Sequence, residues 1–357
     1  MHRQIKYYEA ILEATDQKMA QDPNVYIMGL GVPDPKAIFG TTAGLAEKYG
    51  PDRVMDMPTS ENAMTGVAVG TAILGMRPIM THQRVDFFIL ALDQLINNAA
   101  KWHYMFGNQM KVPLVIRLII GRGWGQGPQH SQTLHSFFAH IPGLKVVMPS
   151  TPYDAKGLLV SAIEDDNPVV YLEHRWLHNV FGEVPSEMYR VPIGKAKIVQ
   201  QGSDVTLVAC SHMTLEAFRA VKWLQEEGVS AELIDLRTIK PLDKETILES
   251  IRKTGRLVVI DPDWKTAGFS AELLAIAAEE AHSSLKVAPV RIAHPDRLTP
   301  TSWALANHFY PTAKHIAMEV LKMMQKPIKA KQLLEEIIKQ SMQIPLDVPD
   351  KEFTGPF

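Results

Sequence analysis

The chain has 357 residues, 46% of them hydrophobic, with 37 lysines and arginines against 39 aspartates and glutamates. This length suits two domains, and the hydrophobic share is enough for sizeable buried cores. A formal net charge of -2 excludes the basic footprint of a nucleic-acid-binding protein and a polybasic membrane patch.

Cysteine content and apolar stretches indicate a soluble protein of a reducing compartment. Cys210 is the single cysteine, so an intrachain disulfide is excluded. The first six residues lack the apolar core of a signal peptide. The longest apolar stretches, such as 66–74, are far shorter than the roughly 20 residues of a membrane span. We therefore expect a cytoplasmic protein with no nucleic-acid or membrane partner.

Short apolar runs alternate with amphipathic stretches in the first half of the chain. Strands are expected at 25–28, 77–80, 114–117, 145–148 and 169–172. Helices are expected around 4–20, 61–75, 88–105 and 152–164. This alternation, with continuously apolar strands, is typical of a doubly wound α/β domain with a mainly parallel sheet covered on both faces.

The alternation of apolar runs and amphipathic stretches is interrupted after about residue 178 and resumes at residue 205. Residues 179–203 carry few long apolar runs, and we place an interdomain linker at 186–203. Further strands are expected at 205–209, 231–235, 256–260 and 287–292. Helices at about 213–227, 243–252 and 268–283 lie between them. This second unit is typical of a smaller doubly wound domain.

These patterns divide the chain into four parts. We expect an N-terminal domain over 1–185, the linker, a C-terminal domain over 204–326 and a tail over 327–357. The tail contains a charged helical stretch, 330–343, followed by three prolines. A frayed terminus and an arm that packs on a partner subunit are both compatible with this composition.

Several common catalytic and phosphate-binding signatures are absent from the sequence. It contains no Walker loop, no Gly-x-Ser-x-Gly nucleophile elbow and no His or Cys pair at convincing zinc spacing. Residues 121–127 are glycine-rich, but their spacing is not that of a dinucleotide-binding loop, so we interpret them as a mobile loop.

Residues 59–70 combine the start of a helix with an acid. Ser60 is a candidate N-cap, and Glu61 lies in the first turn. Gly66 and Gly70 are four residues apart, so they share one helical face and permit close packing. An acid in the first turn also suits the helix dipole without any catalytic role. The residues alone therefore leave a functional and a purely structural role for Glu61 open.

Five stretches, in this order and spacing, form a specific signature. They are Met57-Pro58-Thr59-Ser60-Glu61 with Gly66 and Gly70; Gln83-Arg84-Val85-Asp86-Phe87 with Leu92-Asp93-Gln94; Gln129-His130-Ser131-Gln132; residues 140–149; and residues 235–243. With them, the chain from about residue 4 to 325 resembles the beta subunit of thiamine-diphosphate-dependent 2-oxoacid dehydrogenases, in the transketolase superfamily. The resemblance implies an N-terminal pyrimidine-binding domain and a C-terminal domain like that of transketolase.

The resemblance implies catalytic roles for Glu61 and His130. Glu61 would hydrogen-bond a ring nitrogen of the cofactor's aminopyrimidine and favour the tautomer that deprotonates the thiazolium carbon. His130 would lie near the reacting carbon, where it can stabilise charge or shuttle protons. Phe87 would pack on the pyrimidine ring, and Gln83 would be a further contact of thiamine diphosphate. A core role for Phe87 and a structural role for His130 are the simpler alternatives.

A structural monovalent cation, which we interpret as K+, is also implied by the resemblance. The positions that match its ligands are Leu114, Ala162, Ile163, Asp165 and Asn167. Carbonyl and carboxylate oxygens suit such a hard cation. An ordinary polar turn after a helix would contain the same residues, so both interpretations stay open.

Half of the expected cofactor site is missing from the chain. Family members bind the diphosphate and Mg2+ through a Gly-Asp-Gly motif followed by an Asn, and this sequence contains no Gly-Asp-Gly. The resemblance therefore implies an alpha-type partner that carries this half, in an α2β2 heterotetramer. The implied reaction is oxidative decarboxylation of a 2-oxoacid, with transfer of the acyl group to the lipoyl group of an acyltransferase core.

The sequence also departs from the family pattern. His82 and Arg84 stand where most relatives have acidic, apolar or small residues, residues 118–120 replace a Gly-Pro-x-Gly, and the end of the chain from residue 300 differs. An alternative function is therefore a split transketolase-like or carboligase enzyme of a specialised pathway, without a lipoyl core. There, His82, Arg84 and Arg122 would serve an anionic or polyhydroxylated acceptor. A third hypothesis is a non-catalytic subunit that kept the fold.

Overall fold

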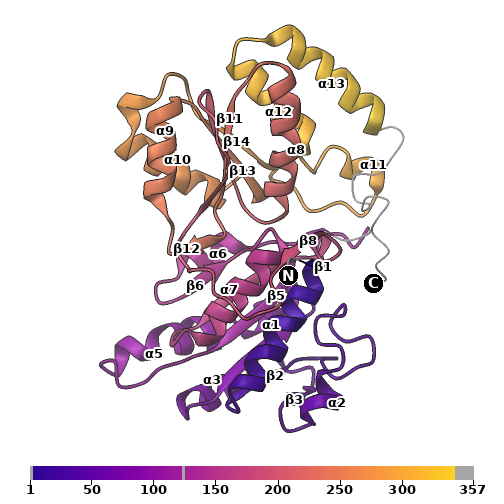
Figure 1. Cartoon of the computed structure of the whole chain (residues 1–357), viewed down its shortest axis with the longest axis vertical. Coiled ribbons are helices and arrows are strands. Elements are labelled where there is room, and N and C mark those ends of the chain that lie inside the picture. The colour runs from indigo at the N-terminus through magenta and orange to yellow at the C-terminus, as the bar shows by residue number, and fades with distance from the viewer. Residues whose placement is uncertain (1–2, 123–124, 342–357) are drawn as a thin grey trace.

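Buried apolar strands build the N-terminal sheet of the computed structural model, which describes residues 3–122 and 125–341 (Figure 1). The strand order is β12-β6-β7-β5-β4-β2-β3, and every neighbouring pair except β12 and β6 is parallel. The strands are β2 (Val25–Met28), β3 (Val54–Met55), β4 (Arg77–His82), β5 (Val115–Ile120), β6 (Lys145–Val147), β7 (Val169–His174) and β12 (Thr238–Lys240). Every residue of β5 and β7 is buried, as expected for a parallel sheet covered on both faces.

Helices cover both faces of this sheet. They are α1 (Tyr7–Gln21), α2 (Leu45–Tyr49), α3 (Glu61–Ile73), α4 (Val85–Phe88), α5 (Ala100–Met105), α6 (His135–His140) and α7 (Pro152–Glu164). Helices α1 and α7 pack together in a core that contains Ile119, whereas α3 packs in a second core with Leu118 and Ile120. Neighbouring residues of β5 enter opposite cores because strand side chains alternate between the two faces.

The helix expected over 88–105 is divided into shorter pieces. After α4, a 3-10 turn (Ile89–Ala91) and a π-helical segment (Gln94–Ala99) precede α5. In the π-helical segment the Asn98 amide donates to Gln94 Oε1 at 2.8 Å. Residues 118–120, which replace the family's Gly-Pro-x-Gly, simply continue β5 and are fully buried.

The C-terminal domain contains a five-stranded sheet of order β14-β13-β10-β11-β9, in which only β9 is antiparallel to its neighbour. Its strands are β9 (Lys197–Gln200), β10 (Val205–Ala209), β11 (Ala231–Asp235), β13 (Leu257–Trp264) and β14 (Val290–His294). Its helices are α8 (His212–Glu226), α9 (Lys244–Thr254), α10 (Phe269–Glu280), α11 (Trp303–Ala306), α12 (Ala313–Met323) and α13 (Pro327–Ser341). Helices α8 and α12 share a core on one face, and α9 and α10 cover the other.

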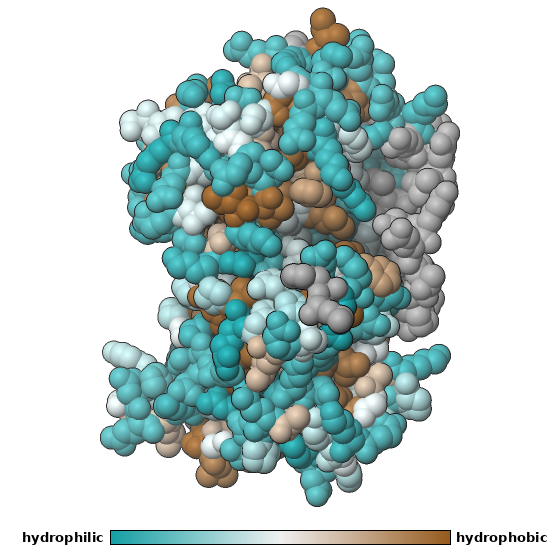
Figure 2. Space-filling model, viewed as in Figure 1, coloured by the Kyte–Doolittle hydropathy of each residue, from teal (hydrophilic) through white to brown (hydrophobic). Residues whose placement is uncertain are grey.

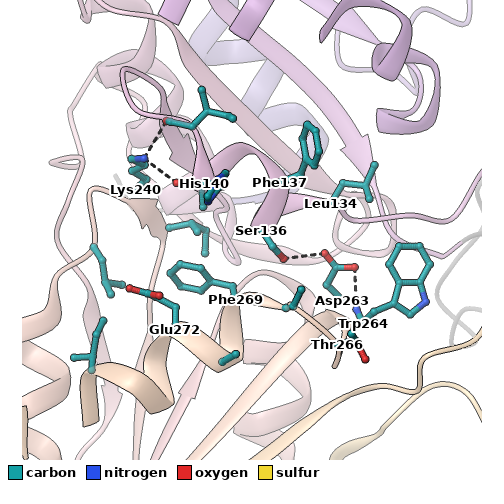
Figure 3. Close-up of a pocket in the computed structure, with 18 of the residues that line it drawn as sticks. Leu134, Ser136, Phe137, His140, Lys240, Asp263, Trp264, Thr266, Phe269 and Glu272 are labelled. Carbon is teal, nitrogen blue, oxygen red and sulfur yellow. Dashed lines mark hydrogen bonds between the residues drawn. The ribbon is translucent and has the colours of Figure 1, made fainter. Parts of the chain in front are cut away.

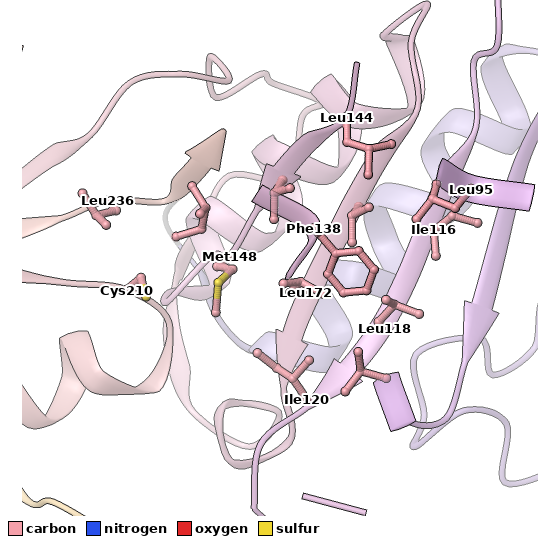
Figure 4. Packing of buried hydrophobic residues seen from close by; sticks show 14 of the residues in the cluster. Leu95, Ile116, Leu118, Ile120, Phe138, Leu144, Met148, Leu172, Cys210 and Leu236 are labelled. Atoms are coloured by element: carbon pink, nitrogen blue, oxygen red, sulfur yellow. The ribbon is translucent and has the colours of Figure 1, made fainter. Parts of the chain in front are cut away.

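The two domains are joined by a continuous seam. Strand β12 leaves the C-terminal domain and pairs with β6 at the edge of the N-terminal sheet. One apolar core runs from Leu118 and Phe138 through Met148 to Cys210 and Leu236 of the C-terminal domain (Figure 4). A two-stranded ribbon of β1 (Arg3–Lys6) and β8 (Phe181–Val184) closes the N-terminal domain.

The predicted architecture of two doubly wound α/β domains with mainly parallel sheets is confirmed. Strand β9 lies inside the segment expected as a linker, 186–203, and belongs to the C-terminal sheet. The expected tail begins as α13, whose Ala330 is buried in the core of its own domain, whereas residues 342–357 lie outside the described residues.

Two surface properties complete the description of the fold. Across the residues that the structure describes, no helix is long and apolar enough to cross a membrane. The face in Figure 2 is mostly hydrophilic, with small groups of apolar residues, one of them beside the waist where the two domains meet.

Candidate active site

Three site residues predicted from the sequence follow strands of the N-terminal sheet. Glu61 opens α3 soon after β3, Phe87 lies in α4 directly after β4, and His130 lies in the loop after β5. Because these strands are parallel, their carboxyl ends lie on one edge of the sheet, which is where ligands of such folds bind. This topology places the predicted residues on one edge, although they are far apart in the sequence.

The Glu61 carboxyl group lies at the start of α3 and is only 9% exposed. No hydrogen bond or ion pair of this carboxylate is found within residues 3–122 and 125–341. Ser60 occupies the N-cap position, but its side chain makes no capping hydrogen bond, so the expected side-chain cap is absent. A nearly buried acid without a partner is costly, and it suits a ligand with a hydrogen-bonding ring nitrogen. The site therefore fits the aminopyrimidine that the resemblance implies.

Phe87 and His130 are in direct contact. Their ring centroids lie 5.2 Å apart, and the planes are nearly perpendicular at 86°. Phe87 keeps 36% of its surface exposed, so it is not an ordinary core residue. Gln132, two residues after His130, donates to Asp86 Oδ1 at 2.7 Å, which ties the two loops together. Burial raises the pKa of the Asp86 carboxyl, although the Gln132 hydrogen bond opposes this shift.

Gln83 lies between β4 and α4 and points toward the loop after β2. Its Nε2 donates to the Leu30 carbonyl oxygen at 3.3 Å. Gly31 has a φ of 74°, and a Cβ there would lie 3.4 Å from Gln83 Nε2, so the loop passes close to this side chain. Gln83 therefore reaches the same edge as Phe87 but is bound to the backbone of its own chain.

The unusual basic residues near the edge are built into the fold. His82 is buried edge-on against Phe88 at 4.9 Å, and burial lowers its pKa to about 3, so it is neutral. Arg84 donates to the Gly121 carbonyl oxygen at 3.0 Å and also to Gln126, and burial lowers its pKa to about 10.

Arg122 is also held within the fold, and its side chain lies between two aromatic rings. Its guanidinium lies 3.6 Å from the Trp176 centroid and 4.5 Å from that of Tyr310, which belongs to the C-terminal domain. Gly127, further along the same loop, packs on the C-terminal domain, since a Cβ there would lie 2.6 Å from Thr301 Oγ1. Residues 123–124, which fall inside the predicted mobile loop, lie outside the described residues.

The five residues matched to cation ligands surround a turn that is already bonded to two basic side chains. Arg77 donates to the carbonyl oxygens of Ile163 and Asp165, at 3.0 and 3.2 Å. The Lys145 ammonium bonds the Asp165 carboxylate. The Leu114 carbonyl accepts from Val169, the Ala162 carbonyl accepts from Asp165, and Asn167 donates to Asp165. Each of these five residues thus already takes part in a bond within the chain.

A sizeable cavity lies away from these residues. It measures about 930 Å³ and is lined by α6, by β12 and the segment after it, and by the start of α10 (Figure 3). Leu134, Phe137 and Phe269 line it, whereas Glu61 and His130 do not. In the described part of the chain, no group of three or more His, Cys, Asp or Glu side chains could hold a metal ion.

Sequence analysis missed one cluster of titratable residues. His135 in α6 lies against Asp261 and Asp263 of β13, with Nε2 3.1 Å from Asp261 Oδ1. Their separation of more than 120 positions hides this cluster in the sequence, and no motif signals it.

Comparisons with known proteins cover nearly the whole chain. Residues 3–179 match the family model of the transketolase pyrimidine binding domain, and residues 194–316 match that of the transketolase C-terminal domain. A solved structure titled as a split gene transketolase, inactive beta4 tetramer, superposes with a TM-score of 0.73 at 24% identity. The superposition covers 89% of this chain and 97% of that one. At this identity it supports the fold alone.

Relatives in sequence agree with one another. The beta subunit of acetoin:2,6-dichlorophenolindophenol oxidoreductase from Cupriavidus necator is 42% identical, over 91% of this chain and 99% of the relative. The beta subunit of pyruvate dehydrogenase E1 from Acholeplasma laidlawii is 44% identical, over 89% and 98%. The 2-oxoisovalerate dehydrogenase beta subunit from Bacillus subtilis is 41% identical, over 82% and 90%.

These identities, over most of each chain, decide the family and confirm the resemblance seen in the sequence. Membership implies thiamine diphosphate as the cofactor and an alpha-type partner in a heteromeric assembly. The chain belongs to the beta subunits of thiamine-diphosphate-dependent 2-oxoacid dehydrogenases, in the transketolase superfamily.

Proposed function

We propose that this chain, with an alpha-type partner, decarboxylates a 2-oxoacid and transfers the resulting acyl group to a lipoyl acceptor. The observation that carries the proposal is the nearly buried Glu61 carboxylate, which has no partner among the described residues and lies on the same sheet edge as the contacting pair Phe87 and His130. The named activities of the relatives support the reaction class.

Each residue has a distinct task in this proposal. When bound, thiamine diphosphate supplies the nucleophilic carbon and the electron sink that decarboxylation requires. Glu61 would share a proton with a ring nitrogen of the aminopyrimidine, and Phe87 would pack against that ring. Gln83 would be a further contact of the cofactor. His130, held against Phe87, stabilises charge or moves a proton beside the reacting carbon.

The partner would bind the exposed face of α3 and the segment that follows β4. Ala63, Val67, Gly70 and Leu74 repeat at helical spacing along one face of α3, and Val67 and Leu74 are 49% and 85% exposed. Gly66 and Gly70 permit close packing, as the sequence indicates. Gly66 meets Gln94 at an ordinary contact distance, whereas a Cβ at Gly70 would meet nothing within 4 Å. No residue in the described part of this chain packs closely against Gly70, so we assign the close packing expected there to the partner subunit.

Apolar side chains are also exposed on the segments between β4 and β5. Leu90, Tyr104 and Met105 are 67%, 87% and 63% exposed. Contiguous exposed apolar residues mark interaction sites in soluble proteins. A partner that covers them would also close the cofactor edge against water, which strengthens the electrostatic interactions inside.

The remaining parts of the assembly follow from the sequence and the family. The partner carries the diphosphate and Mg2+ ligands, because this chain has no Gly-Asp-Gly motif. The assembly is α2β2, and the composition suits the cytoplasm. A K+ ion would use Asn167 Oδ1 and the second lone pairs of the Leu114, Ala162, Ile163 and Asp165 carbonyls, beside the Arg77 guanidinium.

The alternative of a split transketolase-like or carboligase enzyme depends on the basic residues near the edge. Arg84 and Arg122 both flank Gly121 and come from segments at the carboxyl ends of β4 and β5. An anionic acceptor at this edge would meet their charge. Turnover with a 2-oxoacid that requires a lipoyl domain supports the main proposal, whereas turnover with aldehyde or sugar acceptors and no lipoyl domain supports the alternative.

Calorimetry tests the split cofactor site. Thiamine diphosphate with Mg2+ is titrated into this chain co-purified with its alpha-type partner, and into this chain alone. Binding to the complex only is expected. Tight, Mg2+-dependent binding to the isolated chain would mean that the diphosphate site lies in this chain, and the proposal would then be wrong.

A further inference from the structure

The loop that carries His130 is bound to both domains. On the N-terminal side, the Gly121 amide donates to the Gln132 carbonyl oxygen at 3.0 Å. The Gln132 side chain donates to Asp86 at 2.7 Å, next to Phe87. These bonds set the distance of the loop from the cofactor edge but leave its other side to the C-terminal domain.

The other side of the loop is bound to residues 261–263, near the end of β13, by Thr133, His135 and Ser136. Thr133 Oγ1 donates to the Pro262 carbonyl oxygen at 2.9 Å. His135 Nε2 lies 3.1 Å from Asp261 Oδ1, and its Nδ1 lies 3.7 Å from Asp263 Oδ2. The Ser136 hydroxyl donates to Asp263 at 3.3 Å (Figure 3). Leu134, in the middle of these contacts, has a φ of 54°, a left-handed conformation that a leucine adopts only when its surroundings hold it.

The contact between His135 and the two aspartates is a buried charge contact rather than a hydrogen bond, since neither ring nitrogen of His135 meets hydrogen-bond geometry. The His135 side chain is fully buried, and those of Asp261 and Asp263 are 3% and 7% exposed. Burial lowers the pKa of His135, but the charges of Asp261 and Asp263 outweigh it and raise the pKa overall. The Asp261 pKa is lowered, since His135 and the Ser270 amide overcome the effect of burial. Burial raises the pKa of Asp263, the more distant acid.

We propose that His135 is a positioning residue for His130: its ring, held between Asp261 and Asp263, fixes the catalytic loop to the C-terminal domain. The C-terminal domain would then contribute to catalysis by fixing the position of a group on the N-terminal domain. This inference rests on the proposed function for its kinetic consequence only, because the fixing of the loop is a property of the chain itself. His135 is not a catalytic residue, since no contact joins it to Phe87 or His130.

Amide hydrogen exchange on the full chain, alone and in its complex, tests the fixing of the loop directly. With His135→Gln, exchange in peptides covering 128–134 should become about tenfold faster than in the unchanged chain. The matched control is Asp154→Asn, which removes another buried ion pair of the seam, that with Arg237 at 3.1 Å, on α7 rather than on this loop. Its loop exchange should equal that of the unchanged chain. Unchanged loop exchange in His135→Gln would overturn the proposal.

A pH series and a double variant separate positioning from general stability. The raised pKa means that the contact is complete below the ordinary histidine value near 6.5 and is lost as pH rises through the raised value. Loop protection, corrected for intrinsic exchange, should therefore fall with rising pH in the unchanged chain but not in His135→Gln. Asp263, His294 and Cys210 also share this charge environment. The double variant His135→Gln/Asp261→Asn should exchange no faster in the loop than His135→Gln, and additive effects would overturn the pairing.

Kinetics of the reconstituted complex give the functional measurement. In His135→Gln, kcat should fall by about 10- to 100-fold, the effect of a misplaced catalytic group, while the Kd for thiamine diphosphate stays unchanged. A changed Kd with unchanged kcat would overturn the proposal. If His135→Gln does not fold, Thr133→Val removes only the neighbouring hydrogen bond, and it should raise exchange in the same peptide. If the complex has no 2-oxoacid activity, the proposed function is wrong, and the exchange data still decide the role of His135.

Discussion

The cofactor edge of the N-terminal domain and the seam between the domains treat buried charge in opposite ways. At the edge, the Glu61 carboxylate is 9% exposed and has no partner within the described residues. At the seam, Asp154 meets Arg237 at 3.1 Å, and Asp261 meets His135 at the same distance. In the part of the chain that the structure describes, the buried charge at the edge is unpaired, whereas the buried charges at the seam are paired.

Paired buried charges suit a region that stabilises the fold, whereas an unpaired buried charge suits a region that binds a ligand. A buried charge is tolerated when it is paired, and breaking such a pair leaves the remaining charge at high cost. A catalytic acid must instead stay unpaired until its ligand arrives. The seam therefore holds the two domains as one unit, whereas in the proposed function the edge becomes functional only when a second polypeptide and the cofactor cover it.

Removing the unpaired acid should have the largest effect. We expect Glu61→Ala to lower turnover of the reconstituted complex by roughly 10³-fold, because the aminopyrimidine ring loses its proton-sharing partner. Steady-state assays with 2-oxoacids measure this loss. The control Glu245→Gln removes an acid from the first turn of another helix, α9, and should leave turnover unchanged. Unchanged turnover in Glu61→Ala would contradict the catalytic role and favour a non-catalytic subunit.

A charge on the exposed face of α3 should next break the assembly. Leu74→Asp places a carboxylate in the proposed interface, and we expect affinity for the alpha-type partner to fall about 100-fold. Surface plasmon resonance measures the Kd, and circular dichroism confirms that the chain stays folded. Leu298→Asp alters a leucine of the C-terminal domain that is 76% exposed and serves as the control. Equal affinity of both variants for the partner would move the interface elsewhere.

Breaking the seam should cost stability rather than cofactor affinity. Asp154→Asn leaves the partly buried Arg237 guanidinium without its counter-ion, and we expect a loss of ~3 kcal/mol in the free energy of unfolding. Urea titration followed by tryptophan fluorescence measures this loss. Lys322→Ala breaks a pair in which the lysine is 50% exposed and should cost less than about 1 kcal/mol. Equal losses would mean that the seam pair is no stronger than a surface pair.

Per pH unit, the titration of a buried acid at the seam should have the smallest effect on the free energy of unfolding. Burial, followed by the charge of Asp154, raises the pKa of Asp235 to about 7. The folded chain therefore binds this proton more tightly than the unfolded chain. The free energy of unfolding should fall by at most ~1.4 kcal/mol per pH unit as pH rises from about 4 to about 7.

Asp235→Asn should remove this slope, because its side chain carries no titrating proton. Urea titrations at half-unit pH steps measure the slope in each variant. Asp52→Asn, at an exposed position, should keep the slope of the unchanged chain. Parallel curves for Asp235→Asn and the unchanged chain would show that Asp235 is not the titrating group.

Local patterns in the sequence determined most secondary-structure elements and the family. The strands expected at 205–209 and 231–235 and the helix expected at 152–164 match β10, β11 and α7 residue for residue. These elements depend on contiguous apolar runs and on the 3.6-residue period, which are local properties. The motif around Glu61 is local as well, so its position at the start of α3 could be predicted.

Only the tertiary structure decided the features that depend on distant residues. Strand β12 pairs with β6, more than 90 positions away, and β9 joins the C-terminal sheet from within the expected linker. The continuous helix expected over 88–105 is divided by a π-helical segment. Arg77 binds the turn expected to hold a cation, and His135 meets Asp261 across the seam. Hydrogen bonds and charge pairs of this kind depend on which surfaces the fold brings together, and no periodicity along the chain encodes them.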